Sequence, residues 1–99
     1  MNDIVNHIPY GRENAIRRDK LCRIAGLGDR AMREEIEKAR HDGIIILNDQ
    51  DGKGYFRSDD IEDIYRQYKQ NRSRARSILH QNTPLRRVLR EAGRIKPNE

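Results

Sequence analysis

A predicted helix over residues 29–43 carries side chains that could form hydrogen bonds with the edges of DNA bases. Arg30, Glu34 and Glu37 fall on the face opposite its apolar stripe, and Arg33 lies on the flank of that face. An arginine can donate two hydrogen bonds to guanine, and a carboxylate can accept one from cytosine N4. The same residues also form the i, i+4 pairs Arg30–Glu34 and Arg33–Glu37, which are typical of surface ion pairs. The spacing leaves both interpretations open.

Hydrophobic spacing predicts the elements that must position these side chains. Met32, Ile36 and Ala39 recur at i, i+4 and i+7, which predicts a buried stripe on the 29–43 helix, with Gly43 ending it. A shorter helix is predicted over residues 18–25, and its inward-facing side chains are Leu21, Ile24 and Ala25. The Gly26-Leu27-Gly28 turn connects the two helices. Two helices joined so tightly are typical of a helix-turn-helix, whose second helix enters the DNA major groove.

The elements on either side of this pair predict a winged helix. A short helical segment is expected near Ile4–Ile8, and Ala15-Ile16 could pair as a minimal strand. After the second helix, the β-branched run 44–47 predicts a strand, 48–54 a turn-rich tip and 55–57 the returning strand. The predicted fold class is therefore mostly α with a small β-hairpin, a winged helix-turn-helix followed by a C-terminal helical extension.

The C-terminal third of the chain predicts further helix. Asp59 suits the N-cap of a helix with Glu62 at its third position, a capping-box pair. Thr83-Pro84 predicts that a final helix restarts there, as an N-cap followed by proline, and ends near Gly93. We therefore divide the chain into a winged-helix domain, residues 1–58, and a basic helical extension, residues 59–99.

Charge is distributed unevenly between the two parts of the chain. Residues 1–68 hold twelve Lys and Arg against fourteen Asp and Glu, a net charge of −2, whereas residues 69–99 hold nine against two, a net +7. The excess of basic residues favours a polyanionic partner, but it lies mainly outside the predicted domain. Besides the helix face described above, the candidate nucleic-acid contacts are basic residues elsewhere in the chain: Arg17, Arg18, Lys53, Arg57, Arg72 and Arg76.

The order of these motifs resembles the small winged-helix proteins encoded by phages and prophage-like elements of Gram-positive bacteria. The resemblance covers about residues 15 to 80, and it is carried by Leu21, Gly26, Leu27, Asp29, Arg30, Met32, Arg33, Ile36 and Gly43. It implies non-catalytic binding of double-stranded DNA by a regulator in the cytoplasm of a bacterial host cell. The chain departs from the pattern at two positions. Arg17 stands where Ser or Thr is usual, and Gly28 stands where Ser is usual. Arg17 would exchange a cap worth about 1 kcal/mol for a charge at the DNA backbone.

Composition also predicts how the chain assembles. Hydrophobic residues make up 34% of the sequence and aromatic residues 5%, so the core is thin and a homodimer is expected. Its interface is predicted from apolar positions of the C-terminal helices, which are Tyr68, Ala75, Ile78, Leu79, Leu85 and Leu89. The alternative to DNA binding is a module that binds a host or phage protein, with the basic tail as a non-specific nucleic-acid anchor.

No catalytic, metal or cofactor site is expected from the sequence. The three histidines, His7, His41 and His80, lack the spacing of metal ligands, and no nucleophile–base pair is recognisable. Cys22 is the only cysteine, which excludes an intramolecular disulfide and favours a reducing compartment. No apolar run approaches the length of roughly 20 residues that a membrane span needs. We expect a soluble, cytoplasmic protein that is not an enzyme.

Overall fold

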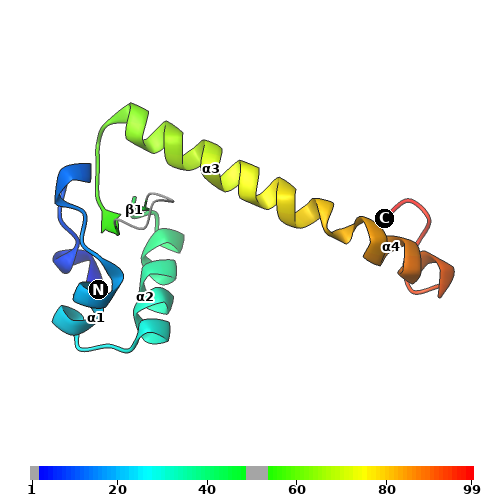
Figure 1. The fold of residues 1–99 in the computed structure, drawn as a ribbon, viewed down its shortest axis with the longest axis horizontal. Helices are drawn as coiled ribbons and strands as arrows, with labels where there is room; N and C mark the ends of the chain where they lie inside the picture. The colour runs from blue at the N-terminus through cyan, green and yellow to red at the C-terminus, as the bar shows by residue number, and fades with distance from the viewer. Residues whose placement is uncertain (1–2, 49–53) are drawn as a thin grey trace. The chain divides into compact units, whose positions relative to one another are not determined.

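The computed structural model describes residues 3–48 and 54–99, and the contacts within the chain divide it into two units, Met1–Gln67 and Tyr68–Glu99. We call them the N-terminal and C-terminal units. The structure is mostly helical with a small two-stranded antiparallel sheet (Figure 1). In chain order the elements are η1 (Asp3–His7), η2 (Arg12–Asn14), α1 (Arg18–Ala25), α2 (Asp29–His41), β1 (Leu47–Asn48), β2 (Tyr55–Phe56), α3 (Ile61–His80) and α4 (Asn82–Glu91).

The core of the N-terminal unit forms where α1, α2 and η1 pack against one another. The predicted stripe of α2 is confirmed, because Met32, Ile36 and Ala39 are all buried. In α1, Leu21 is fully buried, but Ile24 is 49% exposed, so its predicted inward orientation is wrong. Successive helical residues point about 100° apart, and α1 turns its Ala25 flank toward the core rather than its Ile24 flank.

The turn between α1 and α2 follows the glycine pattern of the sequence. Gly26 adopts a left-handed conformation, with φ of 68°, and ends α1 as predicted. The Leu27 amide then donates a hydrogen bond to the Cys22 carbonyl at 3.0 Å, and the Leu27 side chain packs on the core. Gly28 is the N-cap of α2 and provides no capping side chain.

The predicted strand over 44–47 is shorter than expected, because β1 contains only Leu47 and Asn48. After Gly43, with φ of 91°, the Ile44 amide donates back to the Ala39 carbonyl at 3.0 Å and completes the end of α2. The Ile46 carbonyl accepts hydrogen bonds from Arg40 Nε and Nη2, at 3.1 and 2.8 Å. The backbone groups of Ile44 and Ile46 are therefore bonded to α2, and only Leu47 of this apolar run pairs with a neighbouring strand.

Tyr55 joins the small sheet to the segment before α1. β1 and β2 pair antiparallel, with Asn48 opposite Tyr55, and the predicted pairing of Ile16 is present as an isolated bridge to Tyr55. The amides of Ile16 and Tyr55 each donate to the other's carbonyl at 2.8 Å. Gly54, with φ of 112°, lies so close to the Ile16 carbonyl that a Cβ atom would collide with it. The predicted tip residue Lys53 lies outside the described residues.

The boundaries of α3 and α4 differ slightly from those predicted. Asp60, not Asp59, caps α3, because its Oδ1 accepts the Glu62 amide at 2.8 Å. α3 ends at His80, since Pro84 has no N–H to donate to the His80 carbonyl and its ring would crowd that oxygen. α4 therefore starts at Asn82, with Gln81 rather than Thr83 at its N-cap.

The first turns of α3 belong to the N-terminal unit. The Asn48 amide donates to Gln67 Oε1 at 2.8 Å, and Arg12 Nη2 lies 2.9 Å from Asp63 Oδ1. Ser58 Oγ donates to the second oxygen of Asp63 at 2.9 Å. These contacts explain why the chain divides after Gln67, whereas the sequence suggested a boundary after residue 58.

The Arg12–Asp63 contact predicts a pH-dependent contribution to stability. The hydrogen bond from Arg12 is the main reason that the pKa of Asp63 lies below its ordinary value of 3.8. A carboxylate with a lowered pKa stabilises the folded state above the ordinary value, and this contribution is lost as the pH falls through the folded-state pKa. Asp63→Asn should therefore lower the free energy of unfolding by about 1–2 kcal/mol at pH 7. In urea titrations, the difference from the parent should shrink below pH 3.8.

A matched control for this change is Asp59→Asn, which removes one carboxylate at an exposed position beside the same helix start. It should leave the stability at pH 7 nearly unchanged. Equal losses in Asp59→Asn and Asp63→Asn would contradict a specific role for the contact with Arg12.

Candidate functional site

The outward face of α2 carries ion pairs, only one of which matches the predicted pattern. Arg30 Nε lies 3.2 Å from Glu34 Oε1, with the two side chains 90% and 63% exposed. The prediction that Arg33 pairs with Glu37 is wrong, because Arg33 Nε lies 3.1 Å from Asp29 Oδ2 instead. Glu37 faces His41, with 3.8 Å between Oε2 and Nε2. These exposed pairs are weak enough to be exchanged for another partner at little cost.

Asp29 pairs with one arginine from α1 and one from its own helix, α2, and sequence reasoning missed this role. Its Oδ1 lies 3.3 Å from Arg18 Nε, while Oδ2 accepts the contact from Arg33. Asp29 is the first residue of α2, where a carboxylate also interacts favourably with the helix dipole. The i, i+4 spacing signals Arg33 as a partner, but the arrival of Arg18 depends on the packing of α1. Asp29 therefore brings two candidate DNA contacts to one place.

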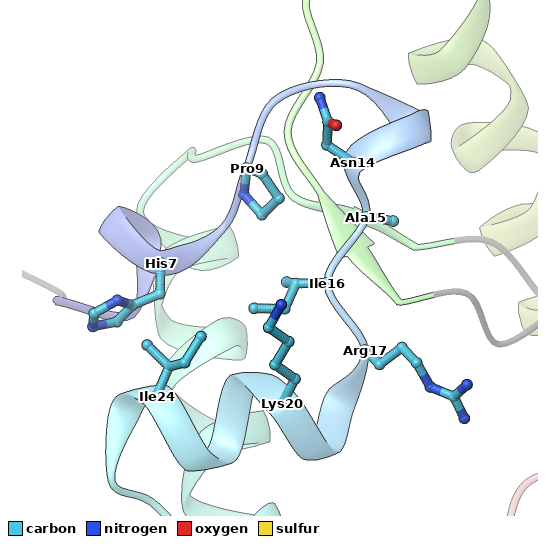
Figure 2. A pocket seen from close by; sticks show the side chains of 8 residues that line it. All are labelled: His7, Pro9, Asn14, Ala15, Ile16, Arg17, Lys20 and Ile24. Atoms are coloured by element: carbon cyan, nitrogen blue, oxygen red, sulfur yellow. The ribbon is translucent and has the colours of Figure 1, made fainter.

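A surface pocket of about 530 Å³ opens beside the N-terminus of α1 (Figure 2). Lys20 and Ile24 project from α1 toward the segment that holds Ile16 and Pro9, whereas Arg17 points away from them. Among the described residues, those that line the pocket are His7, Pro9, Asn14, Ala15, Ile16, Arg17, Lys20 and Ile24, and none of these is acidic. Its electrostatic character is therefore basic, apart from Asp19, which lies 3.9 Å from Arg17 Nε.

Arg17 occupies the N-cap of α1 without capping it. Its backbone is extended, with φ of −68° and ψ of 152°, and no side-chain hydrogen bond satisfies the first amides of the helix. Its side chain is 78% exposed. The expected departure from a Ser or Thr cap thus leaves both a cation and the positive end of α1 at the surface.

Arg40 in α2 contacts both strands of the small sheet. Besides bonding the Ile46 carbonyl, its Nη2 donates to Asn48 Oδ1 at 2.9 Å, and its guanidinium lies 6.0 Å from the Tyr55 ring centre. On the other strand, the Arg57 guanidinium lies 4.7 Å from the Tyr10 ring centre. Arg40 therefore links the sheet to α2. The guanidinium of the candidate contact Arg57 already lies against the Tyr10 ring.

The C-terminal unit carries the remaining candidate residues on exposed helix surfaces. Arg72 stacks over Tyr68 at 5.5 Å, and Arg76 is exposed. Ala75 is exposed, as are the large apolar side chains predicted for the interface: Tyr68, Ile78, Leu79, Leu85 and Leu89. In this unit, all of whose residues are described, no side chain is buried.

Over residues 3–48 and 54–99, no three His, Cys, Asp or Glu side chains are grouped so as to hold a metal ion. None of the helices in the described part of the chain has the length and apolar composition needed to cross a membrane. No family model, curated protein or solved structure matches the chain.

Proposed function

We propose that the chain is a winged-helix protein that binds double-stranded DNA without catalysis, with α2 as its recognition helix. The observation that carries the proposal is the division of α2 into two faces. Met32, Ile36 and Ala39 fix one face in the core, while Arg30 and Arg33 remain on the surface at the N-terminal end of the helix. In helix-turn-helix proteins, the N-terminal residues of the recognition helix contact base edges.

The surroundings of α2 provide groups suited to phosphate. Arg17 and the uncapped amides of α1 offer a positive charge and hydrogen-bond donors, and Lys20 lies one turn further along. Asp29 holds Arg18 beside Arg33, so that one helix start presents two guanidinium groups. In this proposal, Arg17, Lys20 and Arg18 fix the register on the backbone, and Arg30 and Arg33 contact bases.

The resemblance to phage and prophage winged-helix proteins supports a further part of the proposal, that the protein regulates transcription in a phage or mobile element. The candidate contacts Lys53 and Arg57 would belong to the wing, which is the hairpin predicted over residues 44–57. Glu34 and Glu37 would repel phosphate unless they accept hydrogen bonds from cytosine, so we assign them to sequence discrimination.

The test is a competition between duplexes of a selected sequence and random sequence, measured by fluorescence anisotropy at several salt concentrations. Arg30→Ala and Arg33→Ala should each reduce the preference for the selected duplex by about 1–3 kcal/mol, with little change in affinity for random DNA. Arg23→Ala is the matched control, because Arg23 is an exposed α1 arginine that pairs only loosely with Asp19, at 3.9 Å. Variants that bind and discriminate like the parent would contradict the recognition role of α2.

A second candidate function is recognition of another protein by the N-terminal unit. It is favoured by the net charge of −2 over residues 1–68, since a DNA-binding surface is normally basic. In that case the +7 charge of residues 69–99 would act as a non-specific anchor on nucleic acid. Binding that does not depend on DNA sequence, and that survives Arg30→Ala and Arg33→Ala, would favour this function over groove recognition.

A further inference from the structure

The C-terminal unit exposes large apolar side chains on both of its helices. Exposed fractions are 56% for Ile78, 64% for Leu79, 57% for Leu85 and 63% for Val88. The opposite side of α4 is basic, with Arg86, Arg87 and Arg90. A contiguous apolar stripe of this kind is normally buried against a partner.

The stripe follows a heptad repeat with polar residues at two of its core positions. Counting Tyr68 as position a, the a and d positions run Tyr68, Asn71, Ala75, Ile78, Asn82, Leu85, Leu89 and Ala92. The repeat is counted through the junction of α3 and α4, where Gln81 has dihedral angles in the helical region, φ −64° and ψ −17°. Apolar residues at this spacing, with a single Asn at an a position, are typical of two-stranded coiled coils.

The two asparagines indicate which partner fits this stripe. In a parallel pair of identical helices in register, each core residue meets its own copy, so Asn71 meets Asn71 and Asn82 meets Asn82. An asparagine amide can both donate to and accept from another asparagine. An antiparallel pair shifted by one heptad could also pair Asn71 with Asn82, but it would leave Leu89 and Ala92 without a partner layer in residues 68–92. An antiparallel pair that keeps all eight layers would set Asn71 against Leu89 and Asn82 against Ile78. That arrangement would bury amides against apolar side chains, at a cost in desolvation.

The charges beside the stripe indicate the same orientation. In a parallel pair, position g of one helix lies beside the following e position of its partner. This places Arg74 beside Leu79 and Gln81 beside Arg86, with no like charges opposed. The antiparallel arrangement that keeps all eight layers would instead place Arg72 of one chain opposite Arg86 of the other at both ends of the pair.

We propose that residues 68–92 bind a second copy of this chain as a parallel, in-register, two-stranded coiled coil. The side chains at the seam are those of the a and d positions, flanked by Leu79 and Val88. This inference does not depend on DNA binding, because it rests only on the exposed stripe, its asparagines and the flanking charges. If the chain also binds DNA, such a dimer supplies two copies of the N-terminal unit, as a site with two half-sites requires.

Sedimentation equilibrium of the full chain tests whether the pair forms. The parent should be a dimer at micromolar concentration. Leu85→Asp should raise the dissociation constant at least about tenfold, because loss of a buried leucine costs more than the 1.4 kcal/mol that equals one decade. Arg87→Ala, at the outermost heptad position, is the control and should leave the dimer intact. A parent that stays monomeric into the millimolar range would overturn the proposal.

Cysteine cross-linking tests the orientation. In a Cys22→Ala background, Leu89→Cys should form a disulfide-linked dimer on mild oxidation, because the two copies of position 89 face each other only in a parallel, in-register pair. Arg87→Cys should not cross-link. Failure of Leu89→Cys to cross-link, or cross-linking only in a mixture of the Leu89→Cys and Asn71→Cys proteins, would overturn the parallel register.

Discussion

Replacing Arg76, Arg87 and Arg90 by glutamine should weaken binding to selected and random duplexes by similar factors. Residues 69–99 carry a net charge of +7, whereas residues 1–68 carry −2, so most of the attraction to phosphate is expected from the tail. Each phosphate contact that is lost should reduce the slope of log affinity against log salt by about 0.9. The discrimination between duplexes should remain that of the parent, because contacts with phosphate carry no sequence information directly.

The three positions are chosen so that the experiment does not also disrupt the proposed dimer. Arg76 and Arg90 lie at position b, and Arg87 lies at position f, all outside the seam and its flanks. Sedimentation of the triple variant provides the control. An unchanged salt slope with intact assembly would show that the tail does not contact DNA. If the triple variant loses all binding while Arg30→Ala and Arg33→Ala bind normally, the N-terminal unit is not the part of the chain that recognises DNA.

Gly54→Ala should be one of the most destabilising single substitutions in the N-terminal unit. Gly54 has φ of 112°, and an added Cβ would collide with the backbone carbonyl of Ile16. Relief of that collision requires the two 2.8 Å hydrogen bonds between Ile16 and Tyr55 to break or lengthen. Backbone strain and the loss of two hydrogen bonds together predict a decrease of about 3 kcal/mol in the free energy of unfolding.

The matched control for this substitution is Gly28→Ser. Gly28 has an ordinary φ of −71°, and nothing lies within 4 Å of a Cβ built there. As the N-cap of α2 it should accept serine and gain a few tenths of a kcal/mol from the new cap. Urea unfolding followed by circular dichroism measures both variants. Equal stability of Gly54→Ala and the parent would show that the contact between Gly54 and Ile16 does not hold the sheet in place.

Loss of the Ile16–Tyr55 bridge should also affect binding if the sheet is a wing. Ile16 directly precedes Arg17 and the start of α1, so the bridge connects the sheet to the basic pocket. Gly54→Ala would then reduce affinity for DNA more than its loss of folded protein explains. The comparison requires a temperature at which the variant remains folded.

The sequence determined the α1–α2 pair because its signals are local. The burial of Met32, Ile36 and Ala39 follows from helical spacing, and Gly26 and Gly43 adopt the positive φ that ends each helix. The side of α2 that stays at the surface was predictable for the same reason. A helix periodicity specifies which face is buried before any partner is known.

Only the tertiary structure decided what bonds to the 44–47 segment. β-Branched residues favour a strand, but the Ile46 carbonyl accepts a hydrogen bond from Arg40 and the Ile44 amide donates one to Ala39 at the end of α2. These two groups are therefore not available to pair with a strand. Arg12 reaches Asp63 from 51 positions away in the chain, and Gln67 reaches Asn48 from 19. No periodicity in the sequence links residues so far apart, so these contacts have no local signal.

The candidate site, too, was determined partly by the sequence and partly by the tertiary structure. The sequence alone placed Arg30 and Arg33 on an exposed helix face, but the predicted partner of Arg33 was Glu37, although Asp29 lies the same four residues away on the other side. The structure selects Asp29, and Arg18 converges on the same carboxylate from α1. Spacing along one helix cannot distinguish the two carboxylates, whereas the packing of a second helix can, because it brings another cation to only one of them.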